Sequence, residues 1–233
     1  MSHRRGFLSL FKLVLSKGLA LGSQSFLPVF PLSLLMATLE FALQPQTKPS
    51  FVDSTDWFFV FLFFLGLLAL AAFHAAILLR INALRKGISL PLQSAITQGI
   101  EKGIWVFSVM VVYVVIVFLG FLFFIIPGFY LGVSLYFSIF LVVIHEYKKG
   151  VPCYRKLRNY FSESFDLVWG HWWLTFVLLL IVFGVFSSIE QICLLLETKL
   201  ILAVIFCVLA KASILPFWYA CILALLFELK KHH

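Results

Sequence analysis

The feature that most constrains the fold is an apolar run of 42 residues, 104–145, which is interrupted only once. As one α-helix the run would be about 63 Å long, roughly twice the hydrocarbon thickness of a bilayer. The interruption is Pro127-Gly128, where proline disfavours helix at the preceding residue and glycine tolerates turn conformations. The run therefore predicts two antiparallel membrane helices, at about 104–126 and 128–145. We expect their connecting turn at the membrane face opposite the chain ends.

Composition places the rest of the chain in lipid as well. Of its 233 residues 63% are hydrophobic and 12% are charged, whereas an average soluble domain is roughly 25% charged. A membrane-spanning helix needs about 20 apolar residues. Five windows meet that length, at residues 18–43, 57–79, 104–126, 172–196 and 200–227. Together with the second half of the long run they predict an all-α polytopic protein, a single membrane domain of residues 1–233 with six transmembrane helices.

The distribution of Lys and Arg predicts the orientation. Fifteen of the 18 precede the first predicted span, follow the sixth, or lie between the second and third or the fourth and fifth. Such an excess marks cytoplasmic segments, and an even number of spans also puts both termini on one side. We therefore expect both termini in the cytoplasm. Because topology accounts for the net charge of +8, anionic phospholipid is a better partner than nucleic acid, which we do not expect to bind.

Three predicted cytoplasmic segments begin alike, with two basic residues and a glycine. They are Arg4-Arg5-Gly6, Arg85-Lys86-Gly87 and Lys148-Lys149-Gly150. Each is followed by a stretch with apolar residues at steps of three or four, which is typical of an amphipathic helix in the membrane interface. Two spans then follow. We therefore expect three interfacial amphipathic helices and a pseudo-threefold repeat of interfacial helix plus transmembrane hairpin, with units at about 4–79, 85–145 and 148–228.

Basic residues in these segments are the predicted contacts for lipid headgroups. They are Arg4, Arg5, Arg85, Lys86, Lys148, Lys149, Arg155, Lys156 and Arg158. The last three belong to the clearest amphipathic stretch, whose apolar stripe runs from Tyr154 to Val168.

The run IIPGFYLGVSLYFSIFLVVIHEYKKGVPC, followed by SFDLVWGHWWLTFVLLL, resembles a known family pattern. Its matching features are Pro127, Gly128, Gly150, Ser164, Leu167 and Trp169. Over about residues 105–180 the chain is similar to the YciC family of bacterial inner-membrane proteins and to the related membrane domain of some glycerophosphodiester phosphodiesterases. It departs from the pattern by about one extra helical turn between Gly150 and Ser164. The resemblance implies a six-span protein of the bacterial inner membrane, linked to upkeep of the cell envelope, and it brings no catalytic residues.

No reactive constellation stands out in the sequence. His145-Glu146 has Lys149 where a metal-binding helix of the zincin type needs a second His, and neither a phosphate loop nor a nucleophile elbow is present. We therefore expect no enzyme activity, catalytic residue, cofactor or metal site. An enzyme of lipid headgroups would have to use His145, Glu146, Asp166 and His171 at the cytoplasmic face.

Two ionisable residues fall inside predicted spans. A charge at the bilayer centre is costly, so such residues usually face the bundle interior or a wet cavity. Lys211 lies about 18 Å along the sixth span from Lys199, near mid-membrane. It either partners an anionic group or extends to the outer interface. His74 lies in the second span and is expected to be packed or hydrogen-bonded there.

The sequence thus predicts a non-enzymatic inner-membrane protein of cell-envelope or lipid homeostasis. It would act by binding anionic phospholipid or other inner-membrane proteins. The alternative is a transporter or lipid translocator with a polar intramembrane site around Lys211.

Overall fold

The computed structural model describes residues 7–43, 57–145, 153–196 and 201–232, and all its regular elements are α-helices. They are α1 (Phe7–Leu43), α2 (Trp57–Arg85), α3 (Leu92–Phe123), α4 (Ile125–Leu135), α5 (Ser138–Ile144), α6 (Cys153–Val168), α7 (Trp172–Leu196) and α8 (Ile201–His232). Six helical segments are long and apolar enough to cross a membrane, with α4 and α5 together forming one of them. The predicted all-α class and the number of candidate spans are therefore confirmed by length and composition.

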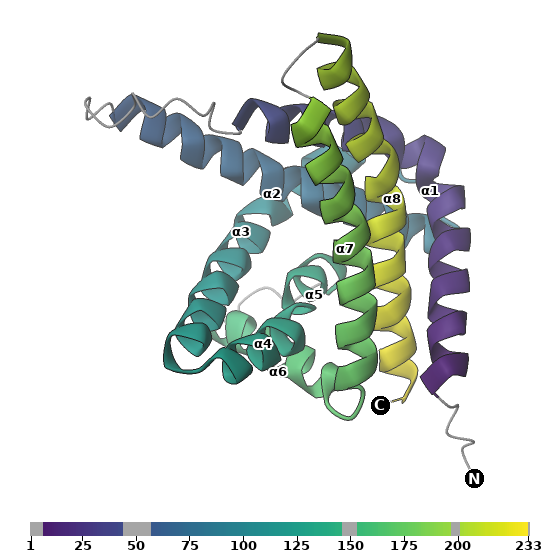
Figure 1. The fold of residues 1–233 in the computed structure, drawn as a ribbon, viewed down its shortest axis with the longest axis vertical. Coiled ribbons are helices and arrows are strands. Elements are labelled where there is room, and N and C mark those ends of the chain that lie inside the picture. Colours follow the sequence, from purple (N-terminus) through teal and green to yellow (C-terminus); the bar gives the residue numbers. More distant parts are fainter. Residues whose placement is uncertain (1–6, 44–56, 146–152, 197–200, 233) are drawn as a thin grey trace.

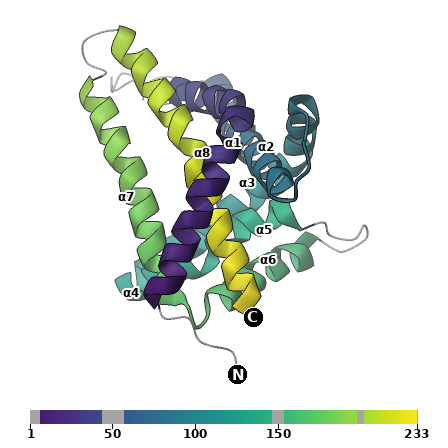
Figure 2. The same ribbon diagram turned by 90° about the vertical axis from the view of Figure 1, so that its right-hand side faces the viewer.

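Helix α8 packs against both α1 and α7, and the beginning of α1 lies beside the end of α8 (Figures 1 and 2). The close approach of α1 and α8 depends on Gly18 and Gly22. A Cβ atom added at Gly18 would lie only 2.8 Å from the Cα of Cys221. Small residues of this kind let helices pack closely in lipid, where apolar area alone gives no preference for a neighbouring helix.

Helix α3 packs on α2 through a second pair of glycines. A Cβ atom added at Gly99 would lie 2.7 Å from the carbonyl oxygen of Ala72, and one added at Gly103 would lie 2.9 Å from the Cα of Ala72. In Figure 1, α2 crosses α7 and α8 at a steep angle, and α3 leads from α2 toward the lower left. The strong tilt of α3 follows from this packing.

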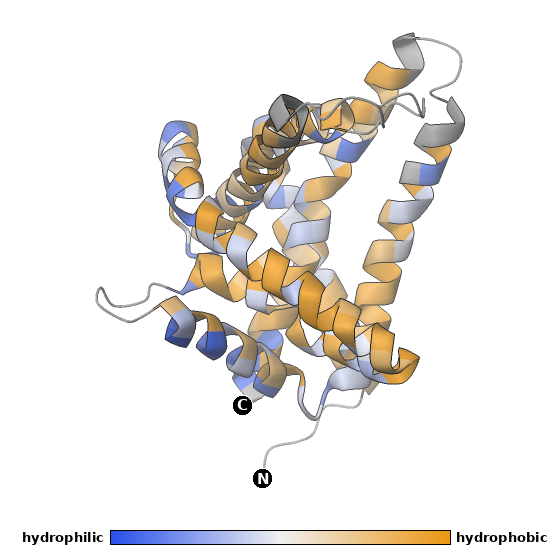
Figure 3. Cartoon of the chain, turned by 90° about the vertical axis from the view of Figure 1, so that its left-hand side faces the viewer, coloured by the Kyte–Doolittle hydropathy of each residue, from blue (hydrophilic) through white to orange (hydrophobic). Residues whose placement is uncertain are grey.

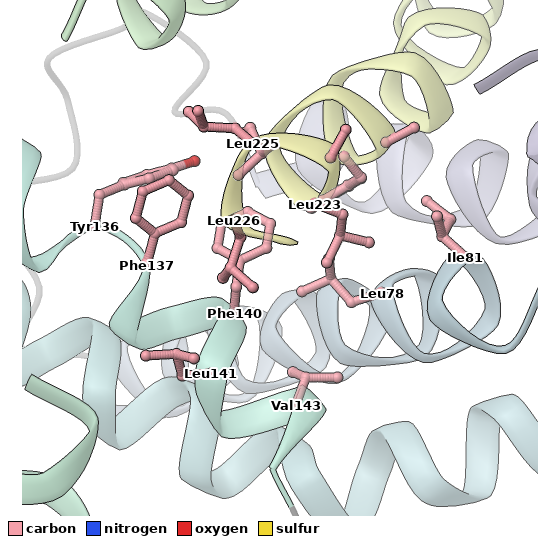
Figure 4. Close-up of a cluster of buried hydrophobic side chains, with 14 of the residues drawn as sticks. Leu78, Ile81, Tyr136, Phe137, Phe140, Leu141, Val143, Leu223, Leu225 and Leu226 are labelled. Carbon is pink, nitrogen blue, oxygen red and sulfur yellow. The ribbon is translucent and has the colours of Figure 1, made fainter. Parts of the chain in front are cut away.

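The largest buried apolar cluster includes residues of all eight helices, and Figure 4 shows the part of it where α2, α5 and α8 meet. Phe137 and Phe140 face Leu226 and Leu223 of α8, with Leu78 of α2 beside them. Phe137 is fully buried. The C-terminal half of α8 thus forms the centre of the protein.

The predicted break in the long apolar run is confirmed, although it lies three residues earlier than the proline. The chain turns at Phe124, whose φ of −158° and ψ of 141° are extended, and α4 begins at Ile125. Pro127 stands in the first turn of α4, where a missing N–H removes no helical hydrogen bond. Gly128 serves helix packing rather than the turn, because an added Cβ would lie 2.8 Å from the backbone nitrogen of Phe121.

The position of this turn differs from the prediction. Along the long axis of the molecule, the α3–α4 turn lies toward the end where α1 begins and α8 ends (Figures 1 and 3). Its predicted position opposite the chain ends is therefore not confirmed. The physical reason is the tilt of α3 described above.

The second half of the run is broken again, at a place where the sequence has neither glycine nor proline to predict a break. Helix α4 ends at Leu135 and α5 begins at Ser138. The break leaves the carbonyl of Ser134 available, and the Ser164 hydroxyl of α6 donates a hydrogen bond to it at 2.8 Å. Ser164, one of the residues in the family-like pattern, thus fixes α6 to the broken helix.

Of the three predicted interfacial helices, only α6 is a separate element. It buries Tyr160, Ser164 and Leu167 and turns its hydrophilic residues away from the bundle (Figure 3). The other two amphipathic stretches are the first turns of α1 and α3, continuous with the spans that follow. The three predicted units therefore differ in construction, and the pseudo-threefold repeat is not confirmed.

Candidate functional site

A groove lies between α1, α2 and α8, near the beginning of α1 and the end of α8. Its volume is about 460 Å³. The basic residues that line it are Lys17, Arg85, Lys230 and Lys231, with Glu228 as the one acidic residue of the lining. The remaining wall is formed by Gln24 and by the apolar residues Ala20, Leu21, Leu84, Ala224 and Phe227. We call this site the cationic groove.

Lys17 and Glu228 hold the α1–α8 side of the cationic groove together. The Lys17 Nζ atom lies 2.6 Å from Oε1 of Glu228, and the Lys231 Nζ atom lies 3.1 Å from the same oxygen. Lys17 precedes Gly18, so the close helix contact at that glycine brings the ammonium group to α8. Two ammonium groups share one carboxylate, which leaves an excess of positive charge.

Arg85 supplies the α2 side. Its guanidinium group lies 3.4 Å from the centroid of the Phe227 ring, and its Nε and Nη2 groups face Oδ1 of Asn82 at 3.4 and 3.3 Å. Helix α2 ends there because Gly87 adopts a positive φ of 75°, and the N–H of Ile88 donates back to the carbonyl of Ala83. The helix end thus presents an exposed arginine that stacks on an aromatic wall.

A second charged cluster, the His145–Glu163–Lys230 cluster, joins the end of α5 to α6 and α8. Glu163 Oε2 lies 3.1 Å from His145 Nδ1, and Glu163 Oε1 lies 2.9 Å from Lys230 Nζ. The Lys230 Nζ atom also lies 2.7 Å from His145 Nε2. Burial raises the pKa of the Glu163 carboxyl, but the hydrogen bonds and charges of His145 and Lys230 outweigh burial and hold that pKa below its usual value. Lys230 belongs both to this cluster and to the groove.

The predicted headgroup contacts are spread over different parts of the structure. Arg85 lines the groove, and Lys86 is exposed next to it. On α6, Arg155 and Arg158 are exposed, and Lys156 lies 5.1 Å from the ring centroid of Trp105. Arg4, Arg5, Lys148 and Lys149 lie outside the described residues.

Three basic residues of the groove were missed as site residues. In the sequence, Lys17, Lys230 and Lys231 stand out only as part of the charge distribution. The signal that could have found them is Gly18-x-x-x-Gly22, which marks the face of α1 that meets another helix.

The two predicted intramembrane polar residues lie away from the groove. Lys211 is only 5% exposed, so its side chain is covered by protein, whereas extension to an interface would require an exposed end. The neighbouring α8 residues Val208 and Ala212 pack on Ala37 of α1. His74 lies edge-on to Tyr219, with ring centroids 5.4 Å apart, as expected for a packed histidine.

A second cavity of about 370 Å³ opens between α3, α4 and α7. Its lining is almost entirely apolar, with Tyr113, Tyr136 and Ser187 as the polar side chains. Tyr113 donates its hydroxyl hydrogen to the carbonyl of Gly132 at 3.0 Å. Lys211 lines neither this cavity nor the groove.

Within the described residues, no group of three or more His, Cys, Asp or Glu side chains could hold a metal ion. A scan against protein-family models matched no family, and searches of curated proteins and of solved structures found no match. The likeness to the YciC family therefore stays a prediction.

Proposed function

We propose that this chain is a non-enzymatic membrane protein that binds the phosphate headgroup of an anionic phospholipid in the cationic groove. The observation that carries the proposal is the groove itself, with four basic side chains from three helices around an apolar wall. Through this binding the protein contributes to lipid or cell-envelope homeostasis in a bacterial inner membrane, with both termini in the cytoplasm.

The electrostatics of the groove favour an anion. Lys17, Arg85, Lys230 and Lys231 outnumber the single carboxylate of Glu228 among the lining residues. An arginine side chain that is stacked on an aromatic ring keeps its planar donors in a fixed orientation, which suits recognition of phosphate oxygens. Basic side chains beside apolar surface also match a molecule whose charged head continues into hydrocarbon tails.

The apolar part of the groove supports a lipid rather than a free phosphate. Leu21, Leu84 and Phe227 present hydrocarbon surface directly beside the charged groups. A soluble phosphate would gain nothing from this surface, whereas the glycerol and upper acyl carbons of a phospholipid would be removed from water there.

The transporter alternative gains less support from the geometry. Lys211 is buried and lines neither cavity, and the second cavity offers few polar groups for a polar substrate.

The test compares two arginine variants in the purified protein, reconstituted in nanodiscs of phosphatidylcholine with added phosphatidylglycerol. Native mass spectrometry measures the retained phosphatidylglycerol, and circular dichroism checks that the helices are intact. We expect Arg85→Gln to weaken retention about tenfold, the size of one charge-assisted hydrogen bond of about 1.5 kcal/mol.

Arg158→Gln is the matched control. Arg158 is exposed on α6 and does not line the groove, so this variant should retain phosphatidylglycerol as the parent protein does. Equal losses in both variants would show that a diffuse cationic surface, and not the groove, binds the lipid. No loss in either variant would refute lipid binding by these basic residues.

A further inference from the structure

We propose that His145, Glu163 and Lys230 form a proton-sensitive latch that releases Lys230 into the cationic groove when His145 gains a proton. The latch has this role only if the groove binds anionic lipid as proposed above, and it adds a regulation to that function. Lys230 connects the two sites, because it lies in the cluster and also lines the groove.

The distances define the closed state of the latch. A lysine ammonium group has only donors, so at 2.7 Å from Lys230 Nζ the His145 Nε2 atom must be the acceptor. The proton of the neutral ring is then on Nδ1 and is donated to Glu163 Oε2 at 3.1 Å. Glu163 Oε1 accepts from Lys230 at 2.9 Å, which closes a ring of three contacts. While His145 is neutral, each of the three contacts joins a donor to an acceptor.

Protonation of His145 breaks this arrangement at one defined atom. With a proton on Nε2, both ring nitrogens are donors and the imidazolium charge faces the ammonium group of Lys230 at contact distance. Glu163 can keep the imidazolium as its partner, and Lys230 is repelled. Because Lys230 is 31% exposed at its side chain and lines the groove, it is free to turn there.

The surrounding charges support this direction of movement. From α6 the carboxylate of Glu163 faces His145, and from α8 Lys230 faces it. On the α3 side, Lys102 donates a hydrogen bond to the carbonyl of Val143, two residues before His145. The groove offers the carboxylate of Glu228 and a bound phosphate as new partners for Lys230. Acidification should therefore strengthen lipid binding.

The experiment measures phosphatidylglycerol retention by the full chain in nanodiscs between about pH 8 and about pH 5.5, the range in which imidazole changes its charge. The phosphodiester of this lipid keeps its charge over that range. We expect retention by the parent protein to rise severalfold on acidification. His145→Gln, which cannot gain a proton, should show no rise, and the matched control His171→Gln should show the full rise.

A third variant tests the closed state directly. Glu163→Gln removes the carboxylate that holds Lys230, so its retention at about pH 8 should already approach that of the acidified parent protein. A rise that survives in His145→Gln, or a Glu163→Gln protein that behaves as the parent at both values, would overturn the latch.

Failure of the latch and failure of the proposed function give different results. If Arg85→Gln loses retention at every pH while the parent protein shows no rise, the groove binds lipid and the latch is wrong. If Arg85→Gln retains phosphatidylglycerol as the parent protein does, the proposed function of the groove is wrong, whatever the result for the latch.

Discussion

Helices α3 and α8 are each 32 residues long and apolar, but they occupy opposite environments. In the membrane-length window of α8 72% of the residues are buried inside the protein, against 17% in α3. The more apolar of the two is α3, the less buried one. Since lipid tails are as apolar as leucine, apolar character does not decide which helix becomes the centre of a membrane protein.

What distinguishes α8 is the kind of surface that meets it. Two glycines of α1 bring the backbones of α1 and α8 into contact, and α8 also carries the buried charged residues Lys211 and Glu228. Helix α3 packs on α2 along its first turns, through Gly99 and Gly103, and on α4 near its end, through Gly120. Its last turns expose large side chains such as Phe118, Leu122 and Phe123. The protein thus has one long helix that is mostly buried and one that is mostly exposed.

The largest effect is expected where α8 is anchored. In Gly18→Ala the new Cβ would lie 2.8 Å from the Cα of Cys221, so the two helices must separate. We expect a loss of about 2 to 3 kcal/mol of unfolding free energy, measured by titration with a denaturing detergent and followed by circular dichroism.

Gly184→Ala is the control for this change. Nothing lies within 4 Å of a Cβ added at that position of α7. The same substitution should be neutral there, or stabilising by up to about 1 kcal/mol through helix propensity. Equal effects at both glycines would show that close contact does not distinguish α8.

A smaller loss is expected in the α3–α4 hairpin. In Gly128→Ala the new Cβ would meet the Phe121 ring and the Phe121 backbone nitrogen at 2.5 and 2.8 Å. The ring can turn away but the backbone nitrogen cannot, so the end of α3 must shift; because that end is largely exposed, we expect a loss of only about 1 kcal/mol. Gly132→Ala, with its closest neighbour at 3.8 Å, is the control and should show no loss in the same titration.

The fold could be predicted from the sequence only in part. Apolar length predicted the six candidate spans, and the Pro127-Gly128 pair predicted the hairpin within a few residues. The break between α4 and α5 could not be read from the sequence, since residues 135–138 contain neither glycine nor proline. A tertiary hydrogen bond, from Ser164 to the carbonyl of Ser134, accompanies this break. The continuity of the first amphipathic turns with α1 and α3 was equally invisible, because a helical pattern does not say where a helix bends.

The candidate site was predicted only in part, for a similar reason. Arg85 was found because it stands in a basic cluster at the end of a span. Lys17 and Glu228 are 211 positions apart, and only the packing of α1 on α8 brings them together. Charge distribution can indicate the side of the membrane on which a lysine lies, but not which helix it faces.

The contact between Glu163 of α6 and Lys230 near the end of α8 provides a pH-dependent test of how α8 is held. The pKa of Glu163 is held below its usual value in the folded protein, so its contribution to stability is present above the pKa of the unfolded chain and is lost as pH falls through the folded pKa. Glu163→Gln should cost about 0.5 to 1 kcal/mol near neutral pH, because the cluster is partly exposed. The difference from the parent protein should shrink below about pH 4. A difference that stays constant with pH would mean that Glu163 does not tie α6 to α8 through its charge.

The smallest effect is expected at the exposed end of α3. Phe123 is 71% exposed and has little protein around it to lose, so Phe123→Leu should change the unfolding free energy in detergent by less than about 0.5 kcal/mol. The matched change Phe137→Leu removes ring volume from a fully buried position against α8 and should cost about 1 kcal/mol or more. Both variants keep an apolar side chain, so only the surroundings differ. A comparable loss at Phe123 would mean that other parts of the chain, or a second protein, cover this end of α3, and the contrast with α8 would then be smaller than the burial values indicate.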